Sequence, residues 1–556
     1  MIGSLTINTM PSAQPSASGN DPESTTNIKE TIESILVAFI LAFIFRAFIV
    51  EAFVIPTGSM APTLLGAHMR MKCPDCGYQF DVNYQAPASE NESDDPQISP
   101  MSRPWADVYC PNCGFLVASR NKEYPVAYGD RILVLKYVYL THAPQRWDVV
   151  VFKSPDKPET TNYTQNFIKR LVGLPNERLM VLDGDIYIST AEDRTWKIQT
   201  KPQSVQDALW RLVNDNDFYP QTPKRQDKGL ADWSQPWKQQ TGSGWNLGTD
   251  AASGRIFHFA NNSGAGEIHF DPNANSTTQT LTDYLVYDNG HDIRSPRPAG
   301  LGSPNDEQAN PVSDLKLTAY YRRTGGAGPL RMKLSRFESM DHTFTAEITP
   351  DAVSLLHRTN NGEKQIGQTL KLADLGIKGD KPIFVELMNV DYQVTLRLNG
   401  QVVLQSTPAD YSPNVNWLRN QWNLQKRGRP GEAAIEAESQ TCSLEHVSLW
   451  RDIYYTNRQD PRNGGAPLPW GSPKQPMELK DGEYFVMGDN SSVSEDARYW
   501  EHDINLPHEG LATESGRVPE QFLLGKAVFV YWPAGFRLLD SNFSVIPDFG
   551  DMRWIH

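Results

Sequence analysis

One apolar segment near the N-terminus constrains this chain more than any other feature of its sequence. Residues 35–55 are almost continuously apolar, and only Arg46 and Glu51 carry charge. As a helix rising 1.5 Å per residue, about 21 residues extend about 31 Å, enough to cross the hydrocarbon core of a bilayer. The segment therefore predicts a membrane anchor over residues 31–55, with the helix itself over about residues 31–50 and Arg46 reaching towards the headgroups, because an arginine at mid-bilayer is costly. A buried core helix is the alternative.

Length and charge set the broad class. With 556 residues the chain exceeds one compact core, so we expect two or more domains. Its net charge of −14 argues against nucleic acid as a partner. Residues 1–30 are rich in Ser, Thr, Pro and Asn and contain little to bury, which predicts a disordered tail. The charges that flank the apolar segment are balanced and do not set its orientation.

Four of the five cysteines form two matching pairs, in Cys73-Pro-Asp-Cys76-Gly and Cys110-Pro-Asn-Cys113-Gly. Each C-P-x-C-G turn directs two thiolates to one point, and two such turns complete a tetrahedral metal site. Because four cysteines leave no open coordination position, we expect a structural zinc in a ribbon-like insert over residues 70–118. Two disulfides are the alternative if this part of the chain lies outside the cytoplasm.

The rest of the sequence predicts a mainly β protein. Strand patterns cover residues 128–139, 147–153, 167–172, 178–189, 483–487 and 525–531. Asp183-Gly184 supplies a hairpin turn within one of them. Close spacing and Gly/Pro turns favour antiparallel pairing.

The amino-acid composition changes over residues 190–455. Trp, Asn, Gly and polar residues dominate, and apolar residues alternate with polar ones at 315–319 and 394–398. Asn399-Gly400 then turns the chain into a returning strand, a strong hairpin signal. The stretch predicts an inserted β-sandwich and is similar in pattern to concanavalin-like or laminin-G-like jelly rolls. Such domains often bind glycans or proteins, and a spacer or cap is the alternative.

The loop that follows the apolar segment, residues 53–64 (F-V-I-P-T-G-S-M-A-P-T-L), places Ser59 where the chain would leave a bilayer. A serine hydroxyl is a weak nucleophile and needs a base. The chain has no G-x-S-x-G sequence, and its 11 histidines form no triad pattern. Lys169 is the better candidate, because strand alternation places it on an apolar face with Phe167 and Leu171. Burial there would have to lower its pKa from about 10.4 to about 7–8, and a solvated lysine is the alternative.

Several sequence boxes occur in the order found in bacterial type I signal peptidases, the leader peptidases. The boxes are residues 53–64, 128–139, 147–152, 167–175 and 488–498, and residues 525–533 resemble the last strand of that family. The chain thus resembles this family over roughly residues 30–72, 120–190 and 475–535. The shared order makes the resemblance specific, although each motif alone is weak.

The resemblance implies a role for individual residues. Ser59 would be the nucleophile and Lys169 its general base, with the Ser59 N–H and the Thr57 hydroxyl forming the oxyanion hole. Ser494 matches the serine that orients the lysine amine. The residues that match a network of charge-assisted hydrogen bonds are Asp489, Asp496, Arg498 and Arg170. The residues that match the walls of shallow pockets for small side chains at substrate positions −1 and −3 are Phe53, Ile55 and Ile168.

The match is incomplete in residues 488–498, which read G-D-N-S-S-V-S-E-D-A-R where the family has G-D-N-R-D-N-S-x-D-S-R. The departures are Ser491, Ser492, Val493 and Ala497. Ser494, Asp496 and Arg498 are retained, so the resemblance implies a divergent active site that keeps its chemistry.

The resemblance also implies a topology. The tail would lie in the cytoplasm, the single-pass anchor in the bacterial inner (cytoplasmic) membrane, and the remainder on the periplasmic or extracytoplasmic side. Family members carry a smaller β domain between two of these boxes. The first, residues 167–175, contains the lysine, and the second, residues 488–498, begins with G-D-N and is called the G-D-N box below. Residues 56–189 and 456–556 would therefore be the two parts of an antiparallel β peptidase domain, and residues 190–455 its enlarged insert.

Together these features predict a membrane-anchored serine endopeptidase that uses a Ser/Lys dyad to remove signal peptides from exported preproteins after small residues. Its partners would be preproteins, the lipid bilayer and a glycan or protein ligand of the sandwich, and catalysis would need no cofactor. Two alternatives are another Ser/Lys protease of the same fold, such as a self-cleaving repressor, and a catalytically silent envelope protein that binds through the sandwich.

Overall fold

The computed structural model describes most of the chain. The described residues are 23–84, 98–155, 165–225, 232–239, 242–275, 281–290, 309–378, 381–457, 468–506, 511–534, 536–537, 544–546 and 548–556. They are mainly β-strand, as the sequence predicts, and divide into two compact units, Met1–Glu51 and Ala52–His556. The predicted disordered tail lies outside the described residues up to residue 22.

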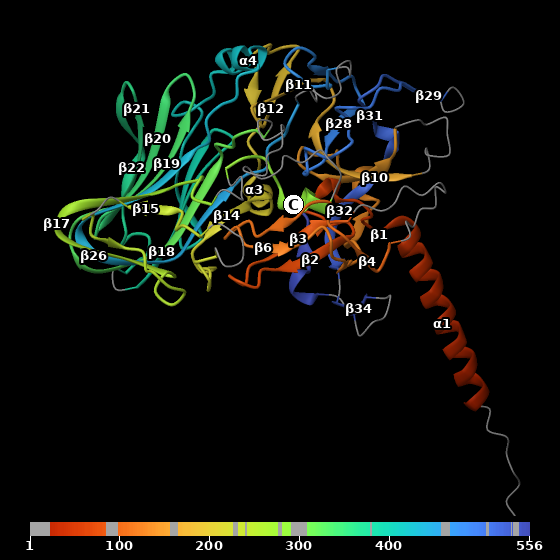
Figure 1. The fold of residues 1–556 in the computed structure, drawn as a ribbon. Coiled ribbons are helices and arrows are strands. Elements are labelled where there is room, and N and C mark those ends of the chain that lie inside the picture. Colours follow the sequence, from red (N-terminus) through yellow and green to blue (C-terminus); the bar gives the residue numbers. More distant parts are fainter. Residues whose placement is uncertain are drawn as a thin grey trace, which may run out of the picture. The chain divides into compact units, whose positions relative to one another are not determined.

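Helix α1 (Glu23–Phe48) makes up most of the described part of the first unit (Figure 1). It begins inside the predicted tail and ends before the predicted end of the anchor, because residues 50–54 form strand β1 (Val50–Val54). The helix expected over about residues 31–50 ends at Phe48, and the last residues of the predicted anchor form a strand, since an apolar run alone does not show where helix gives way to strand. In the described part of the chain, no helix has both the length and the apolar character that crossing a membrane requires.

An eight-stranded antiparallel sheet gathers residues from both ends of the second unit. Its strands are β1, β8 (Arg131–Leu135), β9 (Val149–Lys153), β10 (Asn166–Gly173), β28 (Glu483–Met487), β31 (Val518–Pro519), β32 (Leu523–Trp532) and β35 (Arg553–Trp554). The order is β1-β8-β32-β9-β10-β28-β31, with β35 paired to β32. Strand β10 thus lies between β9 and β28, antiparallel to both.

Most of the strands predicted in this region are confirmed, but the one over residues 128–139 is too long. It ends at Leu135, and residues 138–141 form the short helix α2 (Val138–Thr141). Leu140 is 86% exposed, so the apolar residues that follow Leu135 do not continue the buried face of β8.

A second sheet follows β10 in the chain and has the order β13-β12-β11-β27. Its strands are β11 (Glu177–Leu182), β12 (Asp185–Thr190), β13 (Lys197–Ile198) and β27 (Met477–Glu478). The predicted turn at Asp183-Gly184 is confirmed, with positive φ at both residues. Helix α3 (Gln203–Leu209) comes next.

A 13-stranded antiparallel sheet is built almost entirely from residues 211–451. Its strands are β14 (Arg211–Asp215), β15 (Trp237–Gln239), β16 (Trp245–Asn246), β17 (Ile256–Phe270), β18 (Leu315–Gly326), β19 (Leu330–Phe337), β20 (Asp341–Ile348), β21 (Ala352–Thr359), β22 (Gly362–Lys371), β23 (Ile383–Val390), β24 (Gln393–Leu398), β25 (Gln401–Gln405) and β26 (Glu432–Arg451). The long strand β26 pairs with β14, β17, β18 and β19. The predicted hairpin at Asn399-Gly400 is confirmed as β24–β25, and helix α4 (Val415–Asn423) follows it.

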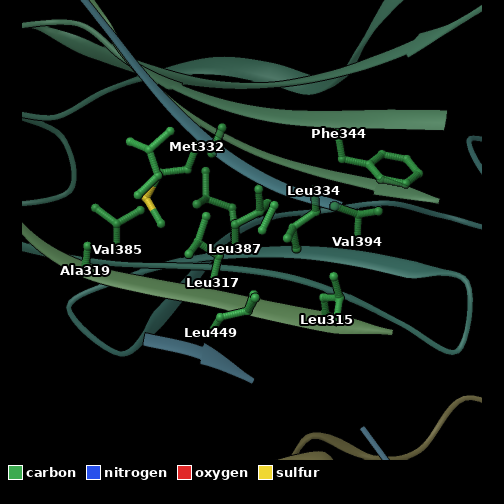
Figure 2. Close-up of a cluster of buried hydrophobic side chains, with 14 of the residues drawn as sticks. Leu315, Leu317, Ala319, Met332, Leu334, Phe344, Val385, Leu387, Val394 and Leu449 are labelled. Carbon is green, nitrogen blue, oxygen red and sulfur yellow. The ribbon is translucent and has the colours of Figure 1, made fainter. Parts of the chain in front are cut away.

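Strands that are distant in the order of this sheet share one apolar core. Figure 2 shows Met332 of β19 and Phe344 of β20 in the same cluster as Leu387 of β23 and Val394 of β24. All four side chains are fully buried. The sheet therefore curls around its core, an arrangement compatible with the predicted sandwich.

The cysteine pairs lie in two similar hairpins. Strand β2 (His68–Lys72) pairs with β3 (Gln79–Asn83), and β5 (Val108–Tyr109) pairs with β6 (Leu116–Ala118). In the two turns Cys73 and Cys110 make the same backbone hydrogen bonds, accepting from the glycine four residues later and donating to the residue after it. The remaining short strands are β4 (Met101–Ser102), β7 (Tyr124–Pro125), β29 (Ile504–Leu506), β30 (Leu511–Thr513), β33 (Phe536–Arg537) and β34 (Ser544–Ile546).

Candidate active site

The loop that carries Ser59 is held between buried apolar residues. Ile55 and Met60 are both buried in one cluster with side chains of β8 and β9, and the Ile55 N–H donates to the Asp130 carbonyl at 2.9 Å. Between them Gly58–Met60 forms the single 3₁₀ turn η1, with Thr57 in an extended conformation before it. Ser59 itself is only half-buried. The loop therefore presents a hydroxyl at the surface of a fixed backbone.

Lys169 reaches this hydroxyl from β10. Its Nζ donates a hydrogen bond to Ser59 Oγ at 2.7 Å, and its side chain is buried on β10, the strand between β9 and β28. Nζ lies 5.7 Å from the centre of the Phe167 ring, on the face that strand alternation predicts. Burial lowers the pKa of Lys169 to about 8, because the ammonium loses its hydration. At that pKa an appreciable fraction of the amine is neutral near pH 7 and can accept a proton.

Asp496 and Arg498 form a buried ion pair next to the dyad. The Arg498 Nε and Nη2 donate to the two carboxylate oxygens of Asp496 at 2.8 and 2.7 Å, and the Gly488 N–H also donates to this carboxylate at 2.9 Å. Burial alone would raise the pKa of Asp496, but Arg498 and these hydrogen bonds hold it below its usual range. The Asp496 carboxylate is therefore paired with Arg498. Among the described residues, no carboxylate forms an ion pair with Lys169.

Arg170 and Asp489 form a second buried pair on the adjoining side. The Arg170 Nε and Nη2 donate to the two oxygens of Asp489 at 2.7 and 2.8 Å. The Thr63 hydroxyl donates to the same carboxylate at 2.7 Å. Thr63 lies in the loop after Ser59, so this pair ties that loop to β10 and to the G-D-N box.

Ser494 is buried beside Gly488 of the G-D-N box but makes no hydrogen bond to the lysine amine. Its side chain is buried, and its hydroxyl has no hydrogen-bond partner in the part of the chain that the structure describes. A Cβ at Gly488 would lie 2.3 Å from Ser494 Oγ and 2.4 Å from the Ser59 carbonyl oxygen, so only glycine fits there. The G-D-N box therefore packs through Gly488 against the loop that carries Ser59 (residues 53–64, called the nucleophile loop below).

Asn490 is a site residue that sequence reasoning missed. Its backbone N–H donates to the Ser59 carbonyl oxygen at 3.1 Å, and its side-chain amide donates to the Gly58 carbonyl oxygen at 3.2 Å. The sequence did mark this position, because Asn490 is the third residue of the G-D-N box and is the same as in the family pattern. Its contacts are long-range in sequence, so no local pattern reveals them.

The residues matched to substrate pockets lie close together. Phe53 and Ile168 are partly exposed and pack against the cluster that contains Ile55. Ile55 is only 2% exposed and contributes mainly to the core. Thr57 is exposed and its side chain does not cap η1.

The four paired cysteines converge on one point. Their sulfur atoms all lie within 4.8 Å of one another, with Sγ–Sγ distances of 3.7 Å for Cys73–Cys113 and 3.6 Å for Cys76–Cys110. Four sulfurs at about 2.3 Å from one zinc would be about 3.8 Å apart, whereas a disulfide needs about 2.05 Å. The spacing and the burial of all four thiols fit a closed tetrahedral metal site better than two disulfides.

A family profile described as "Signal peptidase, peptidase S26" matches residues 28–80, 112–259 and 390–532, more than half of the chain. Among curated proteins, the chain is 32% identical over 73 residues to a probable signal peptidase I-2 of Synechocystis, covering 13% of this chain and 34% of that protein. It is 24% identical over 157 residues to a signal peptidase I of Rickettsia bellii (28% and 38%). It is 36% identical over 86 residues to that of Pseudomonas aeruginosa (15% and 26%). The chain thus spans less than two-fifths of each of these relatives.

Solved structures add little. The chain is similar to a carbohydrate-binding module from Bacillus subtilis, with 11% identity, a TM-score of 0.22 and coverage of 39% of this chain and 95% of that one. For sheep galectin-11 the corresponding values are 9%, 0.17, 25% and 92%. These TM-scores are too low to support an argument. The family match includes the Ser59 loop, Lys169 and the G-D-N box, and it shows that this chain belongs to the signal peptidase family, peptidase S26.

Proposed function

We propose that the chain is a type I signal peptidase that cleaves preproteins with a Ser59/Lys169 dyad. The observation that carries the proposal is the 2.7 Å hydrogen bond between Lys169 Nζ and Ser59 Oγ, made by a buried amine whose pKa is about 8. A silent binding protein would have no use for a lysine held in this state, at a cost of about 3 kcal/mol at 1.36 kcal/mol per pKa unit.

In the proposed reaction Ser59 Oγ attacks the carbonyl carbon of substrate residue −1, and its proton passes to the neutral Lys169 amine. The developing oxyanion accepts hydrogen bonds from the Ser59 N–H and the Thr57 hydroxyl. When the intermediate collapses, the C–N bond breaks and Lys169 returns its proton to the leaving amine, which becomes the new N-terminus. Lys169 then deprotonates a water molecule that hydrolyses the acyl-enzyme ester and releases the signal peptide.

The two buried ion pairs have a positioning role in this proposal. The pairs Arg170–Asp489 and Asp496–Arg498 hold β10, the G-D-N box and the nucleophile loop together. They also leave both carboxylates paired with an arginine and not with Lys169. Phe53 and Ile168 would line shallow sites for small residues at −1 and −3, with Ile55 as their floor. Ser494 would support the lysine amine when Ser59 no longer pairs with it.

Membrane anchoring through α1 is part of the proposal. The described apolar side chains of α1 between Ile32 and Phe43 are each about half exposed or more, a surface that lipid would cover. The catalytic unit would then face the periplasmic side of the inner membrane, where signal peptides present their cleavage sites. A glycan or protein ligand of the large curled sheet remains an additional proposal.

Structural zinc at Cys73, Cys76, Cys110 and Cys113 is also proposed. Each thiolate would supply one ligand, so the metal would stabilise the two hairpins and take no part in the reaction. Elemental analysis of purified protein should give about one zinc per chain, and Cys76→Ser should lose it. A metal-free protein with no free thiols would instead show two disulfides.

The main experiment is cleavage of a preprotein that carries an A-x-A site, using full-length protein in detergent or vesicles. Ser59→Ala and Lys169→Ala should each lower kcat/KM by at least about 10²–10⁴. Lys153→Ala, on the adjacent strand β9, is the matched control and should cleave at close to the wild-type rate. Wild-type rates in both dyad variants would refute the proposed function.

A further inference from the structure

The turn η4 (Val286–Gly290), which belongs to the predicted insert, packs directly against the nucleophile loop. Tyr287 is buried, and a Cβ at Gly58 would lie 2.6 Å from its Cε1 atom. Gly58 is the residue before Ser59, so its missing side chain leaves the space that the Tyr287 ring fills. An element far away in sequence thus forms the back of the nucleophile loop.

Asp288 of this turn extends the contact to the backbone of the dyad. Asp288 is 1% exposed, and its carboxylate accepts a hydrogen bond from the Asn490 side-chain amide at 2.7 Å. The same amide nitrogen donates its other hydrogen to the Gly58 carbonyl oxygen at 3.2 Å. A carboxylate can only accept, so Asp288 forces Asn490 to present its NH₂ group, and not its oxygen, to Gly58.

The Gly58 carbonyl and the Ser59 N–H belong to one peptide unit. A trans peptide is planar, and its C=O and N–H point in opposite directions. The Gly58 oxygen also accepts from the Ala61 N–H at 3.0 Å, so Asn490 and this turn hydrogen bond together fix the direction of the Ser59 N–H. This N–H is the backbone donor of the proposed oxyanion hole.

We infer that Asp288 is a positioning residue for the oxyanion hole: it orients the Asn490 amide, which orients the Gly58–Ser59 peptide. The inference rests on the proposed function, and it makes the large insert part of the catalytic machinery. Asn289 connects η4 to a third segment, because its carbonyl oxygen accepts hydrogen bonds from the backbone N–H groups of Trp105 and Ala106 at 3.0 and 3.3 Å. These residues closely precede Cys110 in the sequence, so η4 links the cysteine hairpins to the nucleophile loop.

The test compares Asp288→Ala with Asp288→Asn in the full-length protein. Asp288→Ala should lower kcat about 10- to 100-fold with little change in KM, less than the 10²–10³ lost when an oxyanion donor is removed outright. Asp288→Asn still offers an acceptor oxygen to Asn490 and should recover most of the rate. Asn490→Ala should give a similar loss, and the double variant Asp288→Ala/Asn490→Ala should add little, because both residues act through one contact.

Two further readouts separate positioning from general damage. The pH dependence of kcat/KM should keep its midpoint in Asp288→Ala, because Lys169 is untouched. A peptide aldehyde that forms a tetrahedral adduct with Ser59 should lose affinity in proportion to kcat/KM. The matched control is Asp217→Ala, a half-exposed acid in the same insert that pairs with His446, which should leave all three measurements unchanged.

Hydrogen exchange of peptides covering residues 53–64 tests the geometry without any cleavage. Asp288→Ala should speed exchange there about tenfold or more, whereas Asp288→Asn should not. If wild-type protein cleaves nothing but exchange responds in this way, the positioning of the loop stands and the proposed function fails. If wild-type protein cleaves through Ser59 but Asp288→Ala changes neither kcat nor exchange, the inference is wrong.

Discussion

Two buried lysines, Lys169 and Lys201, behave in opposite ways. Both side chains are about 5% exposed or less, yet the pKa of Lys169 is lowered to about 8 and that of Lys201 is raised well above its ordinary value. Burial lowers both, but Lys201 Nζ contacts the Asp391 carboxylate and lies 2.9 Å from that of Asp452, which outweighs its burial. Lys169 instead contacts a hydroxyl. Burial thus makes a base only where the nearby carboxylates are already paired with other cations.

The surroundings of Lys201 also explain why its acidic neighbours do not suggest a metal site. Asp185, Asp314 and Asp391 have carboxylate oxygens within 4.8 Å of one another. Asp314 accepts from Arg336, however, and Asp391 accepts from Lys201. Two protein cations already occupy the place that a metal ion would take.

The largest expected effect distinguishes the two lysines by activity. Lys169→Met should lower kcat/KM by at least about 10²–10⁴, because the general base is lost. Lys201→Met should leave the kcat of the folded protein within a few-fold of wild type. Preprotein cleavage, corrected for the folded fraction, measures both, and equal losses would contradict a special role for Lys169.

The same two substitutions should shift stability in opposite directions. Lys201→Met leaves Asp391 and Asp452 without their cation and should destabilise the fold by about 3–5 kcal/mol. Lys169→Met removes an amine whose protonated form is disfavoured by burial, and should stabilise it by up to about 3 kcal/mol near pH 7. Urea unfolding of each variant checks the signs.

The pH dependence sharpens the contrast further. Because the reaction needs neutral Lys169, kcat/KM should fall about tenfold per pH unit below about pH 8 and level off above it. Phe167→Glu would place a carboxylate beside the amine and should move the midpoint upwards. Phe167→Leu, which removes the ring without adding charge, should move it much less, and equal shifts would show that packing, not charge, sets the pKa.

Asp452 gives a smaller pH effect, on stability alone. Burial raises its pKa to about 7, whereas an unfolded aspartate has a pKa of about 3.9. Between these values the folded state binds more protons, so unfolding free energy should fall as pH rises from about 4 to about 7 and then stay level. Asp452→Asn should flatten this slope in thermal unfolding at several pH values, and Asp374→Asn, at an exposed acid of the same insert, should not.

Sequence predicted the parts of this site that are local and missed those that join distant elements. Ser59, Lys169 and the G-D-N box each lie in a short recognisable pattern, and the two C-P-x-C-G turns predict their own hairpins. Asp288 lies 202 positions from Asn490, in a stretch without a motif, so nothing local marks it. The Lys201 cluster is equally hidden, since strand alternation does not predict that a lysine will be buried among acids. Strand β1 was not predicted, because Val50–Val54 continues the apolar run while joining the sheet.

The smallest expected effect concerns Ser494, whose hydroxyl is buried without a hydrogen-bond partner among the described residues. If it supports Lys169 only after Ser59 has left to form the acyl-enzyme, Ser494→Ala should lower kcat a few-fold, up to about tenfold, and leave KM unchanged. It should also stabilise the fold, by about 1–3 kcal/mol, because an unsatisfied buried hydroxyl is removed. Lower kcat together with a higher Tm is a combination that a merely structural residue would not give. A loss as large as that of Lys169→Met would instead mean that Ser494 holds the amine at every step, and no loss would remove it from the site.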